Sequence, residues 1–294
     1  MKFPLLKNTT TIGRIFIFAA MLVVFNIIAT VVQSVTIAMG GSLSDLTTLR
    51  FAQISSQLLT FVFPPILFAC LTQAKPMKYL GFNNIPLWSL IGIAIIYAVM
   101  PLNSFISEWN SQITLPESMA EFDKIIKQLA ETVQAVLEKM VNVDTFGGLI
   151  INLIMIAGLA AFGEELLFRS VLQPFLIRKC RNVHIGIIIT SIIFSMIHFD
   201  IYGFFPRLIL GMLLGYMFFY SRSIWVPMIM HFLNNATVVV LYYLNNIGIT
   251  NIDVETFGQT KVLPLILSII AVIALFWFVI RSYNKEFKTE NTEK

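Results

Sequence analysis

Residues 146–177 read FGGLIINLIMIAGLAAFGEELLFRSVLQPFLI, an apolar run interrupted by Glu164, Glu165 and Arg169. A helix needs about 20 apolar residues to cross a hydrocarbon core of about 30 Å, and this run is long enough. A charged side chain at the bilayer centre costs at least about 2.5–3.5 kcal/mol, so such residues usually have partners and a function. The stretch therefore predicts a membrane-spanning helix that carries a functional cluster.

The rest of the chain has the composition of a membrane protein. Apolar residues make up 57% of the 294 residues and charged residues 12%, whereas roughly 25% charged residues is typical of soluble domains. A soluble fold of this size could not cover so much apolar surface. The net charge of +4 is small and spread along the chain, which argues against a nucleic-acid partner and leaves the lipid bilayer as the main one. Cys70 and Cys180 form no CxxC motif, so neither a disulfide framework nor a cysteine metal site is expected.

Apolar runs of spanning length recur along the whole sequence. We predict an all-α fold, a polytopic membrane helix bundle with about eight transmembrane helices: Ile15–Met39, Phe51–Leu71, Leu87–Ile106, Phe146–Ile177, Val183–Phe199, Phe204–Tyr220, Ile224–Leu244 and Val262–Ile280. Pro64-Pro65 should kink or break the second of these helices.

The segment Glu117–Val143 is the sizeable extramembrane piece. Its apolar residues recur at steps of three and four, with Glu, Lys and Gln between them. This pattern predicts an amphipathic outer helix that lies on the membrane face or packs on the bundle, and a substrate-gating lid is the alternative.

Basic residues indicate the orientation of the bundle. They concentrate in the segments that share a side with the N-terminus, among them Arg14, Lys78, Arg178, Arg222 and Arg281. With an even number of spans, both termini are then cytoplasmic. We expect a multi-pass integral protein of a bacterial plasma membrane, because the sequence contains no long soluble domain or targeting extension.

The cluster in the fourth predicted span contains two acids with different neighbours. Glu165 and Arg169 are four residues apart and share a helix face, so they can form a buried structural ion pair. Glu164 points about 100° away and is not neutralised by that pair. A desolvated carboxylate has a raised proton affinity, which suits a general base that acts on water. The alternative is one structural network of all three side chains.

Two later spans also carry polar residues. His198 lies near the end of the fifth span, and His231 and Asn235 lie four apart on one face of the seventh. With Glu164 they supply what amide hydrolysis requires: a base for water, an imidazole that passes a proton, and N–H groups for the oxyanion. Equally, Glu164, His198 and His231 could ligate a catalytic zinc ion with one position open for water. Both alternatives remain open, so the cofactor is either zinc or none.

These residues stand in an order that resembles a known family. The chain is similar to the intramembrane proteases that include the CAAX prenyl endopeptidases, the lysostaphin-resistance proteins and the bacteriocin-immunity (Abi) proteins. The family's motifs EExxxR, FxxxH and HxxxN here read EELLFR at 164–169, FSMIH at 194–198 and HFLNN at 231–235. The resemblance covers roughly Leu149 to Leu244.

The resemblance implies an eight-helix bundle and an endopeptidase that hydrolyses a peptide bond in a membrane-associated peptide or protein. It implies that Glu164 is the base, His198 its proton-shuttling partner, and His231 with Asn235 the transition-state stabilisers, while Glu165 and Arg169 are structural. We divide the chain into three parts: N-terminal helices with the outer segment (1–145), a catalytic core resembling CAAX proteases (146–246), and the last span with its tail (247–294). A transporter or proton relay that uses the same polar cluster, and a non-catalytic immunity or scaffold protein, are the alternatives.

Overall fold

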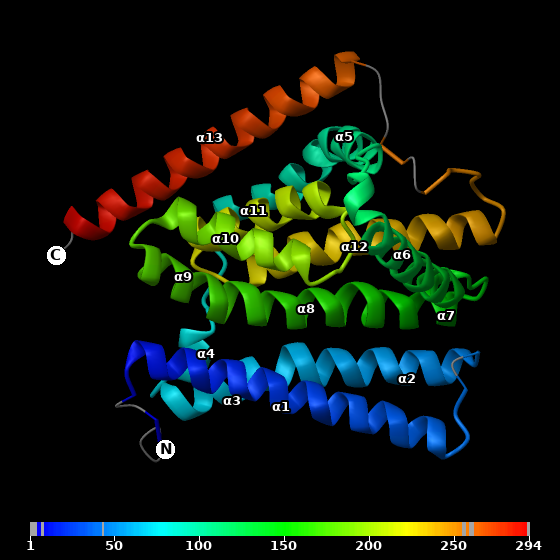
Figure 1. Ribbon diagram of the computed structural model, residues 1–294. Coiled ribbons are helices and arrows are strands. Elements are labelled where there is room, and N and C mark those ends of the chain that lie inside the picture. The colour runs from blue at the N-terminus through cyan, green and yellow to red at the C-terminus, as the bar shows by residue number, and fades with distance from the viewer. Residues whose placement is uncertain (1–4, 7–8, 43, 255–256, 259–261, 293–294) are drawn as a thin grey trace.

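The computed structural model describes residues 5–6, 9–42, 44–254, 257–258 and 262–292. In this part of the chain every regular element is a helix, and long helices run back and forth along one common direction (Figure 1). The predicted all-α membrane bundle is therefore confirmed. In lipid this fold is favoured because a helix satisfies its own backbone hydrogen bonds.

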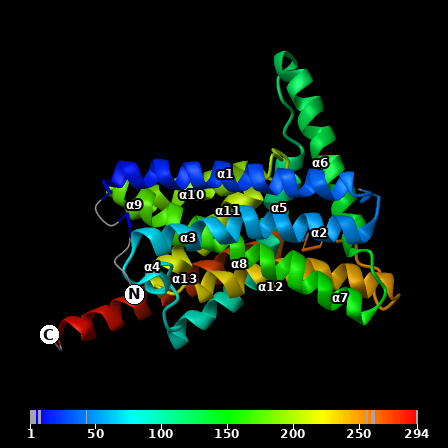
Figure 2. The same ribbon diagram turned by 90° about the horizontal axis from the view of Figure 1, so that it is seen from below.

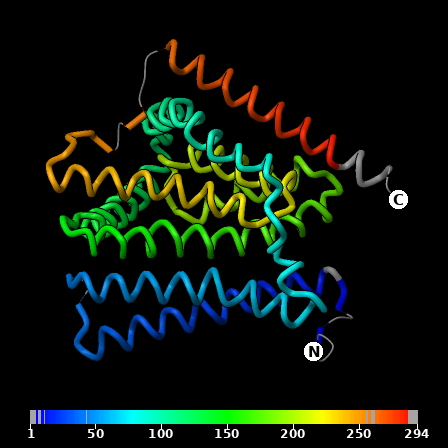
Figure 3. Tube along the Cα trace, turned by 180° about the vertical axis from the view of Figure 1, so that it is seen from behind, coloured from blue at the N-terminus to red at the C-terminus, as the bar shows by residue number. Residues whose placement is uncertain are grey.

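The first two spans form a layer at one side of the bundle, with α13 at the opposite side (Figures 1 and 3). Helix α1 covers Thr11–Ala38, and the second span consists of α2 (Leu46–Gln57), the π-helical turn η1 (Leu58–Val62) and α3 (Phe63–Thr72). The predicted break at Pro64-Pro65 is wrong, because the helical path continues from Leu46 to Thr72. Both prolines lie in the first turn of α3, directly after the π-helical turn, and the first turn of a helix tolerates proline's missing N–H group.

The third span leads to the outer helix. A short helix, α4 (Pro76–Tyr79), precedes η2 (Leu87–Leu90) and α5 (Ile91–Ser111), and the outer segment consists of η3 (Glu117–Met119) and α6 (Ala120–Val141). The predicted outer helix is present. It crosses the direction of the spanning helices and projects from the bundle (Figure 2).

The fourth span is one continuous helical path in the middle of the bundle. It consists of α7 (Phe146–Asn152), η4 (Leu153–Leu159), α8 (Ala160–Glu165), η5 (Leu166–Leu172) and α9 (Gln173–Cys180). The segments η4 and η5 are π-helical and flank α8, which carries Glu164 and Glu165. Such π-helical turns are frequent at functional sites.

The last four helices are α10 (Val183–Met196), α11 (Phe204–Ser221), α12 (Trp225–Asn246) and α13 (Val262–Thr292). Among the described residues, seven helical segments are long and apolar enough to span a membrane, and α10 is the shorter, eighth one. At about 1.5 Å per residue, the 14 residues of α10 reach about 21 Å. The predicted span Val183–Phe199 is thus wrong at its end, because α10 stops just before His198.

Side-chain caps fix where several of these helices begin. In each case a hydroxyl or carboxyl group, or a side-chain amide oxygen, accepts a free backbone N–H group of the first turn. The caps are Thr10 for α1, Asp45 for α2, Thr145 for α7 and Asn182 for α10. The N-terminal end of α1 and the C-terminal end of α13 lie at the same end of the bundle (Figure 1), as an even number of crossings requires.

Candidate active site

A fully buried ion pair lies at the centre of the fourth span. Arg169 Nε is 3.0 Å from Glu165 Oε2, and neither side chain is exposed. The guanidinium also lies 4.9 Å from the centre of the Phe194 ring and donates from Nη2 to the carbonyl of Gly211 at 3.4 Å. Because Glu165 and Arg169 are one helical turn apart, the local helix itself positions the pair.

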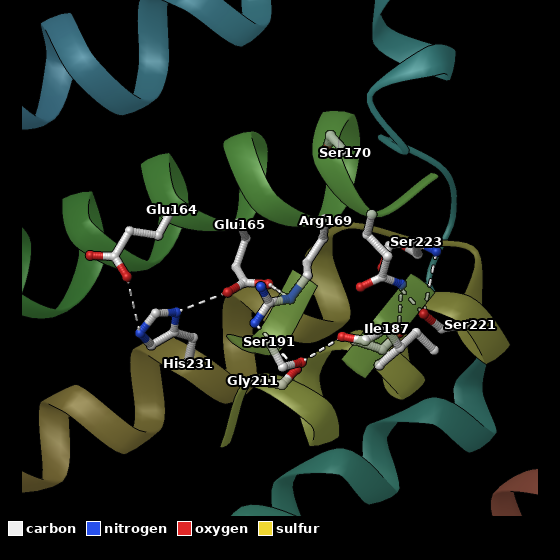
Figure 4. Close-up of polar contacts among 12 residues, drawn as sticks. Glu164, Glu165, Arg169, Ser170, Ile187, Ser191, Gly211, Ser221, Ser223 and His231 are labelled. Carbon is white, nitrogen blue, oxygen red and sulfur yellow. Dashed lines mark hydrogen bonds and ion pairs between the residues drawn. The ribbon is translucent and has the colours of Figure 1, made fainter. Parts of the chain in front are cut away.

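Glu164 has a different environment from its neighbour. The residue is buried, with 8% of its surface exposed, and its carboxylate points away from Arg169 (Figure 4). The carboxylate faces the His231 ring, whose Nε2 is 3.9 Å from Glu164 Oε2. The guanidinium therefore pairs with Glu165, and Glu164 faces an imidazole.

His231 joins the two acids. Its Nδ1 lies 3.0 Å from Glu165 Oε1, while its Nε2 faces Glu164 (Figure 4). A carboxylate can only accept, so we assign the proton of the neutral ring to Nδ1. This contact was missed by the sequence analysis, because spacing within one helix gives no signal for a contact between α8 and α12.

A buried turn sets the depth of His231. The residues between α11 and α12 hydrogen-bond to the segment after α4: the N–H group of Ile224 donates to the Gly81 carbonyl at 2.8 Å, and Ser223 Oγ donates to the Asn83 carbonyl at 2.8 Å. Gly81 has φ +84, and a Cβ atom there would lie 2.9 Å from the Phe218 ring, so glycine is required at this close approach. Helix α12 consequently starts inside the bundle, and its second turn reaches the level of Glu165.

His198 follows the C-terminal end of α10, and its ring contacts Phe194. Its Nδ1 is 2.9 Å from the Phe194 carbonyl, which can only accept, so Nδ1 carries the proton of the neutral ring. The centre of the Phe194 ring is 5.3 Å from that of His198 and 5.9 Å from that of His231. Glu164 and His231 both act electrostatically on His198. Phe194, the first residue of FxxxH, thus contacts both imidazoles. In each ring Nδ1 is held by a hydrogen bond, so Nε2 is the nitrogen that remains to exchange a proton.

The loop after His198 is held by several contacts. Phe199 has a positive φ of 50, which is unfavourable for a bulky side chain and is tolerated where the surroundings impose it. Asn110 at the end of α5, which has no exposed surface, donates from Nδ2 to the Ile201 carbonyl at 2.9 Å and accepts from the Phe205 N–H group at 2.8 Å. The sequence analysis missed Asn110, because an asparagine in an outer segment carries no motif.

Asn235 lies one turn beyond His231 on α12. Its Oδ1 accepts from Asn234 Nδ2 at 3.1 Å. This contact occupies the acceptor of the Asn235 amide and leaves its NH₂ group as the donor for a ligand. Asn234 occupies an unspecified position of HxxxN, and its hydrogen bond orients Asn235, the asparagine that the motif specifies.

The predicted zinc ligands do not fit a preformed metal site. Within the described residues, no three His, Cys, Asp or Glu side chains lie close enough together to hold a metal ion. Glu164 and His231 face each other, but His198 does not join them as a third ligand. We therefore derive no chemical step through zinc.

The cluster carries a net negative charge in an apolar interior. Glu164, Glu165 and Arg169 carry a formal charge of −1 together, and all three are buried. An uncompensated charge is expensive in such surroundings. The contact of Glu164 with the His231 ring thus places a polar partner beside the acid that Arg169 does not pair with.

Comparisons with known proteins cover this central part of the chain. Residues 146–237 match the family model described as "Rce1-like: Type II CAAX prenyl endopeptidase Rce1-like". A segment of 89 residues is 35% identical to the uncharacterized protein YpbD of Bacillus subtilis (strain 168), and the match covers 29% of this chain and 42% of that protein. No solved structure matches the chain. The family match contains all three motifs of the site, and residues 146–237 are thus an Rce1-like domain of the CAAX protease family.

Proposed function

We propose that the protein is an intramembrane endopeptidase that hydrolyses a peptide bond in a membrane-associated peptide or protein. Glu164 activates water, His198 carries the proton, and His231 with Asn235 stabilises the transition state. Glu165 and Arg169 hold His231 in place. The match of residues 146–237 to a type II CAAX prenyl endopeptidase supports the reaction class.

One observation carries the proposal. Glu164 is a buried carboxylate that faces the Nε2 atom of His231 at 3.9 Å, while the nearby guanidinium of Arg169 pairs with Glu165 at 3.0 Å. A separation of 3.9 Å is too long for a direct hydrogen bond. The acid is thus buried and close to an imidazole, while the nearby guanidinium makes its ion pair with the neighbouring Glu165.

In the proposed first step, Glu164 takes a proton from a water molecule, and the resulting hydroxide attacks the carbonyl carbon of the scissile bond. The carbonyl π electrons move to its oxygen, which becomes the oxyanion. The Asn235 amide group donates to this oxygen. His231 enters the step as the imidazolium: one proton on Nδ1 points to Glu165, whose charge balances the ring, and a second proton, taken from solvent before the substrate binds, stays on Nε2 throughout and donates to the oxyanion.

In the second step, the carbon–nitrogen bond breaks. His198 receives the proton from Glu164 on Nε2 and donates it to the departing amine nitrogen, so that a carboxylic acid and an amine leave the site. The hydrogen bond between His198 Nδ1 and the Phe194 carbonyl, 2.9 Å long, favours the ring orientation that this transfer needs.

Localisation follows from the same proposal. The protein would cleave its substrates at a bacterial plasma membrane, and both termini would lie on the cytoplasmic side, where the basic residues concentrate.

The test compares Glu164→Gln with a matched surface variant. Purified protein in liposomes is incubated with a library of quenched fluorescent peptides. We expect Glu164→Gln to reduce cleavage by a factor of about 10³ or more, because a general base contributes typically 10²–10⁴-fold, while Glu131→Gln on the exposed face of α6 leaves the rate unchanged. An active, folded Glu164→Gln protein would refute the proposal, and ion flux into the same liposomes would favour a transporter.

A further inference from the structure

A groove opens beside the candidate site, between the first two spans and the catalytic helices. It encloses about 530 Å³ and is lined by residues from α1, α2, η1, η5 and α10. Most of its lining is apolar, as expected for a surface that faces lipid. The groove thus lies between the layer of α1 and α2 (Figures 1 and 2) and the helical segments next to Glu164 and His198.

The groove is lined by sequence neighbours of the proposed catalytic residues, and not by those residues themselves. Ile197 and Phe199, which flank His198 in the sequence, both line it. Leu167 and Phe168 line it as well, and they follow Glu164 by three and four residues, which places them on its helix face. A molecule in the groove would therefore lie within one helical turn of both Glu164 and His198.

Three hydrogen-bonding side chains interrupt the apolar lining. They are Asn26 on α1, Ser56 on α2 and Thr60 in η1. Thr60 Oγ1 donates to Asn26 Oδ1 over 3.4 Å, which is a long contact, and among the described residues Ser56 makes no side-chain hydrogen bond. Lipid chains cannot use such groups, and polar groups are costly in hydrocarbon.

A fourth polar side chain, Gln57, follows Ser56 in the sequence and points toward Gly163 without lining the groove. Gln57 is 8% exposed, and its Oε1 is buried without a hydrogen-bond partner in the described part of the chain. This oxygen lies 3.6 Å from the position that a Cβ atom on Gly163 would occupy. The same Cβ would lie 2.9 Å from Phe61 Cβ, so glycine before Glu164 allows η1 to approach closely. A buried acceptor without a donor thus adjoins the residue that precedes the proposed base.

We propose that this groove binds a membrane-embedded polypeptide segment in an unwound, extended conformation and delivers it to Glu164. This inference rests on the proposed protease function and specifies its substrate class. An unwound segment has free backbone N–H and C=O groups that need partners in lipid. Ser56 and Thr60 supply hydroxyl groups along the groove, and Asn26, whose Nδ2 already donates to the Leu22 carbonyl at 2.9 Å, supplies its Oδ1 as an acceptor. The apolar lining accepts the side chains.

The decisive experiment fills the groove. Ala19 lines it from α1, whereas Ala20 is exposed and does not line it, so Ala19→Trp and Ala20→Trp are a matched pair. Two probes share one cleavable sequence taken from the peptide library: a spanning peptide of about 20 residues in the liposome membrane, and a short water-soluble peptide. We expect Ala19→Trp to slow cleavage of the spanning probe at least about tenfold and to leave that of the short peptide within about twofold. Ala20→Trp should leave both unchanged.

A second pair of variants tests the polar row without changing its volume much. Ser56→Ala with Thr60→Val removes two hydroxyl groups, each worth about 0.5–1.5 kcal/mol in a hydrogen bond, so the KM for the spanning probe should rise by about tenfold. Thr30→Val, which removes an exposed hydroxyl on α1 outside the groove, is the control. Equal cleavage of the spanning probe by wild type and Ala19→Trp would overturn the inference and leave the groove to lipid. Equal slowing of both probes would also overturn it.

Binding is measured separately from catalysis. In the Glu164→Gln protein, a photoreactive benzoylphenylalanine at position 19 should crosslink to the spanning probe at least about tenfold more than one at position 20. Equal crosslinking at both positions would refute the groove even in an active enzyme. Strong crosslinking at position 19 in a protein whose wild type cleaves neither probe would instead refute the protease function and keep the groove as a peptide-binding site.

Discussion

Nε2 of His231 lies 3.9 Å from Oε2 of Glu164 across the interface between α8 and α12. The opposite nitrogen of the same ring is 3.0 Å from Glu165, which in turn contacts Arg169. The His231 ring thus lies between Glu165, whose charge is neutralised by Arg169, and Glu164, which makes no such ion pair. The two adjacent glutamates of the EExxxR motif therefore have different physical roles, and substitutions should distinguish them.

The first prediction concerns stability. Glu165→Gln leaves the guanidinium of Arg169 buried without its counter-charge, since neither side chain has exposed surface. We expect a loss of about 3–5 kcal/mol in the free energy of unfolding, because breaking one side of a buried ion pair costs about that much. Unfolding in lipid nanodiscs measures it.

Two controls belong to this stability measurement. Glu164→Gln should change the unfolding free energy by much less, and adding Arg169→Met to Glu165→Gln should recover most of the loss, because the orphaned charge is then gone. Equal destabilisation by the two glutamine variants would mean that Glu164 and Glu165 form one structural network.

The second prediction concerns Phe194, which packs against both imidazoles with ring centres 5.3 and 5.9 Å away. Phe194→Leu keeps an apolar side chain but removes the aromatic ring that both imidazoles contact in an edge-to-face arrangement. We expect a loss of about 1–2 kcal/mol in stability and a fall of about tenfold in kcat, since small misplacements of catalytic groups are costly. Phe168→Leu is the control: this ring packs against Phe194 at 5.2 Å but occupies one of the unspecified positions of EExxxR, so kcat should change less.

Much of this fold was predictable because spanning lipid imposes one simple requirement, a long apolar helix. The runs 204–220 and 262–280 correspond closely to α11 and the apolar part of α13. The end of α10 was not predictable: apolar residues continue to Phe199, but the chain leaves the helix at Met196 and turns through a positive φ at Phe199. Sequence pattern reports where a helix could run and not where tertiary contacts stop it.

Similarly, the Glu165–Arg169 contact followed from spacing within one helix, whereas the contact between Glu165 and His231 did not. The latter depends on the depth at which α12 begins, which the hydrogen bond from Ile224 to Gly81 fixes. Residues from three separate segments contribute to that depth. No periodicity within one segment encodes it.

The third prediction concerns Asn110, whose side chain makes two hydrogen bonds to the loop that follows His198. Asn110→Ala leaves the Ile201 carbonyl and the Phe205 N–H group without these partners, at about 1–3 kcal/mol for each buried group left unpaired. We expect lower stability and a fall in kcat larger than any change in KM, because Asn110 does not line the groove and holds the backbone that follows His198. Asn103→Ala is a suitable control on the same helix, since Asn103 Oδ1 is buried without a partner in the described residues. A change in KM alone would contradict a positioning role.

The fourth prediction is a pH dependence of the contact between α6 and the His198 loop. Asp123 on α6 accepts hydrogen bonds from Lys127, at 2.8 Å, and from the Tyr202 hydroxyl. The Lys127 contact, followed by that of Tyr202, lowers the pKa of Asp123 below its ordinary 3.8. The same carboxylate raises the pKa of Lys127 above 10.5. The contact thus contributes its full stability between these two values.

The lowered pKa of Asp123 sets the acid limit of this pH range, and the raised pKa of Lys127 sets the alkaline limit. A depressed carboxyl pKa means that the stabilisation is lost as the pH falls through the folded-state pKa, and a raised lysine pKa means that it is lost as the pH rises through the folded-state pKa. Spin labels at Gln128 and Ser111, in a protein without Cys70 and Cys180, report the distance between α6 and α5. The distance distribution should stay narrow from about pH 5 to pH 9 and broaden as the pH falls below 3.8 through the lowered folded-state pKa of Asp123. Tyr202→Phe should broaden it at neutral pH, because Asp123 then keeps only Lys127, a pair on its own helix that no longer ties α6 to the loop. A distribution that is equally narrow at pH 3 and pH 7 would show that apolar packing alone, through buried Ile126, holds α6.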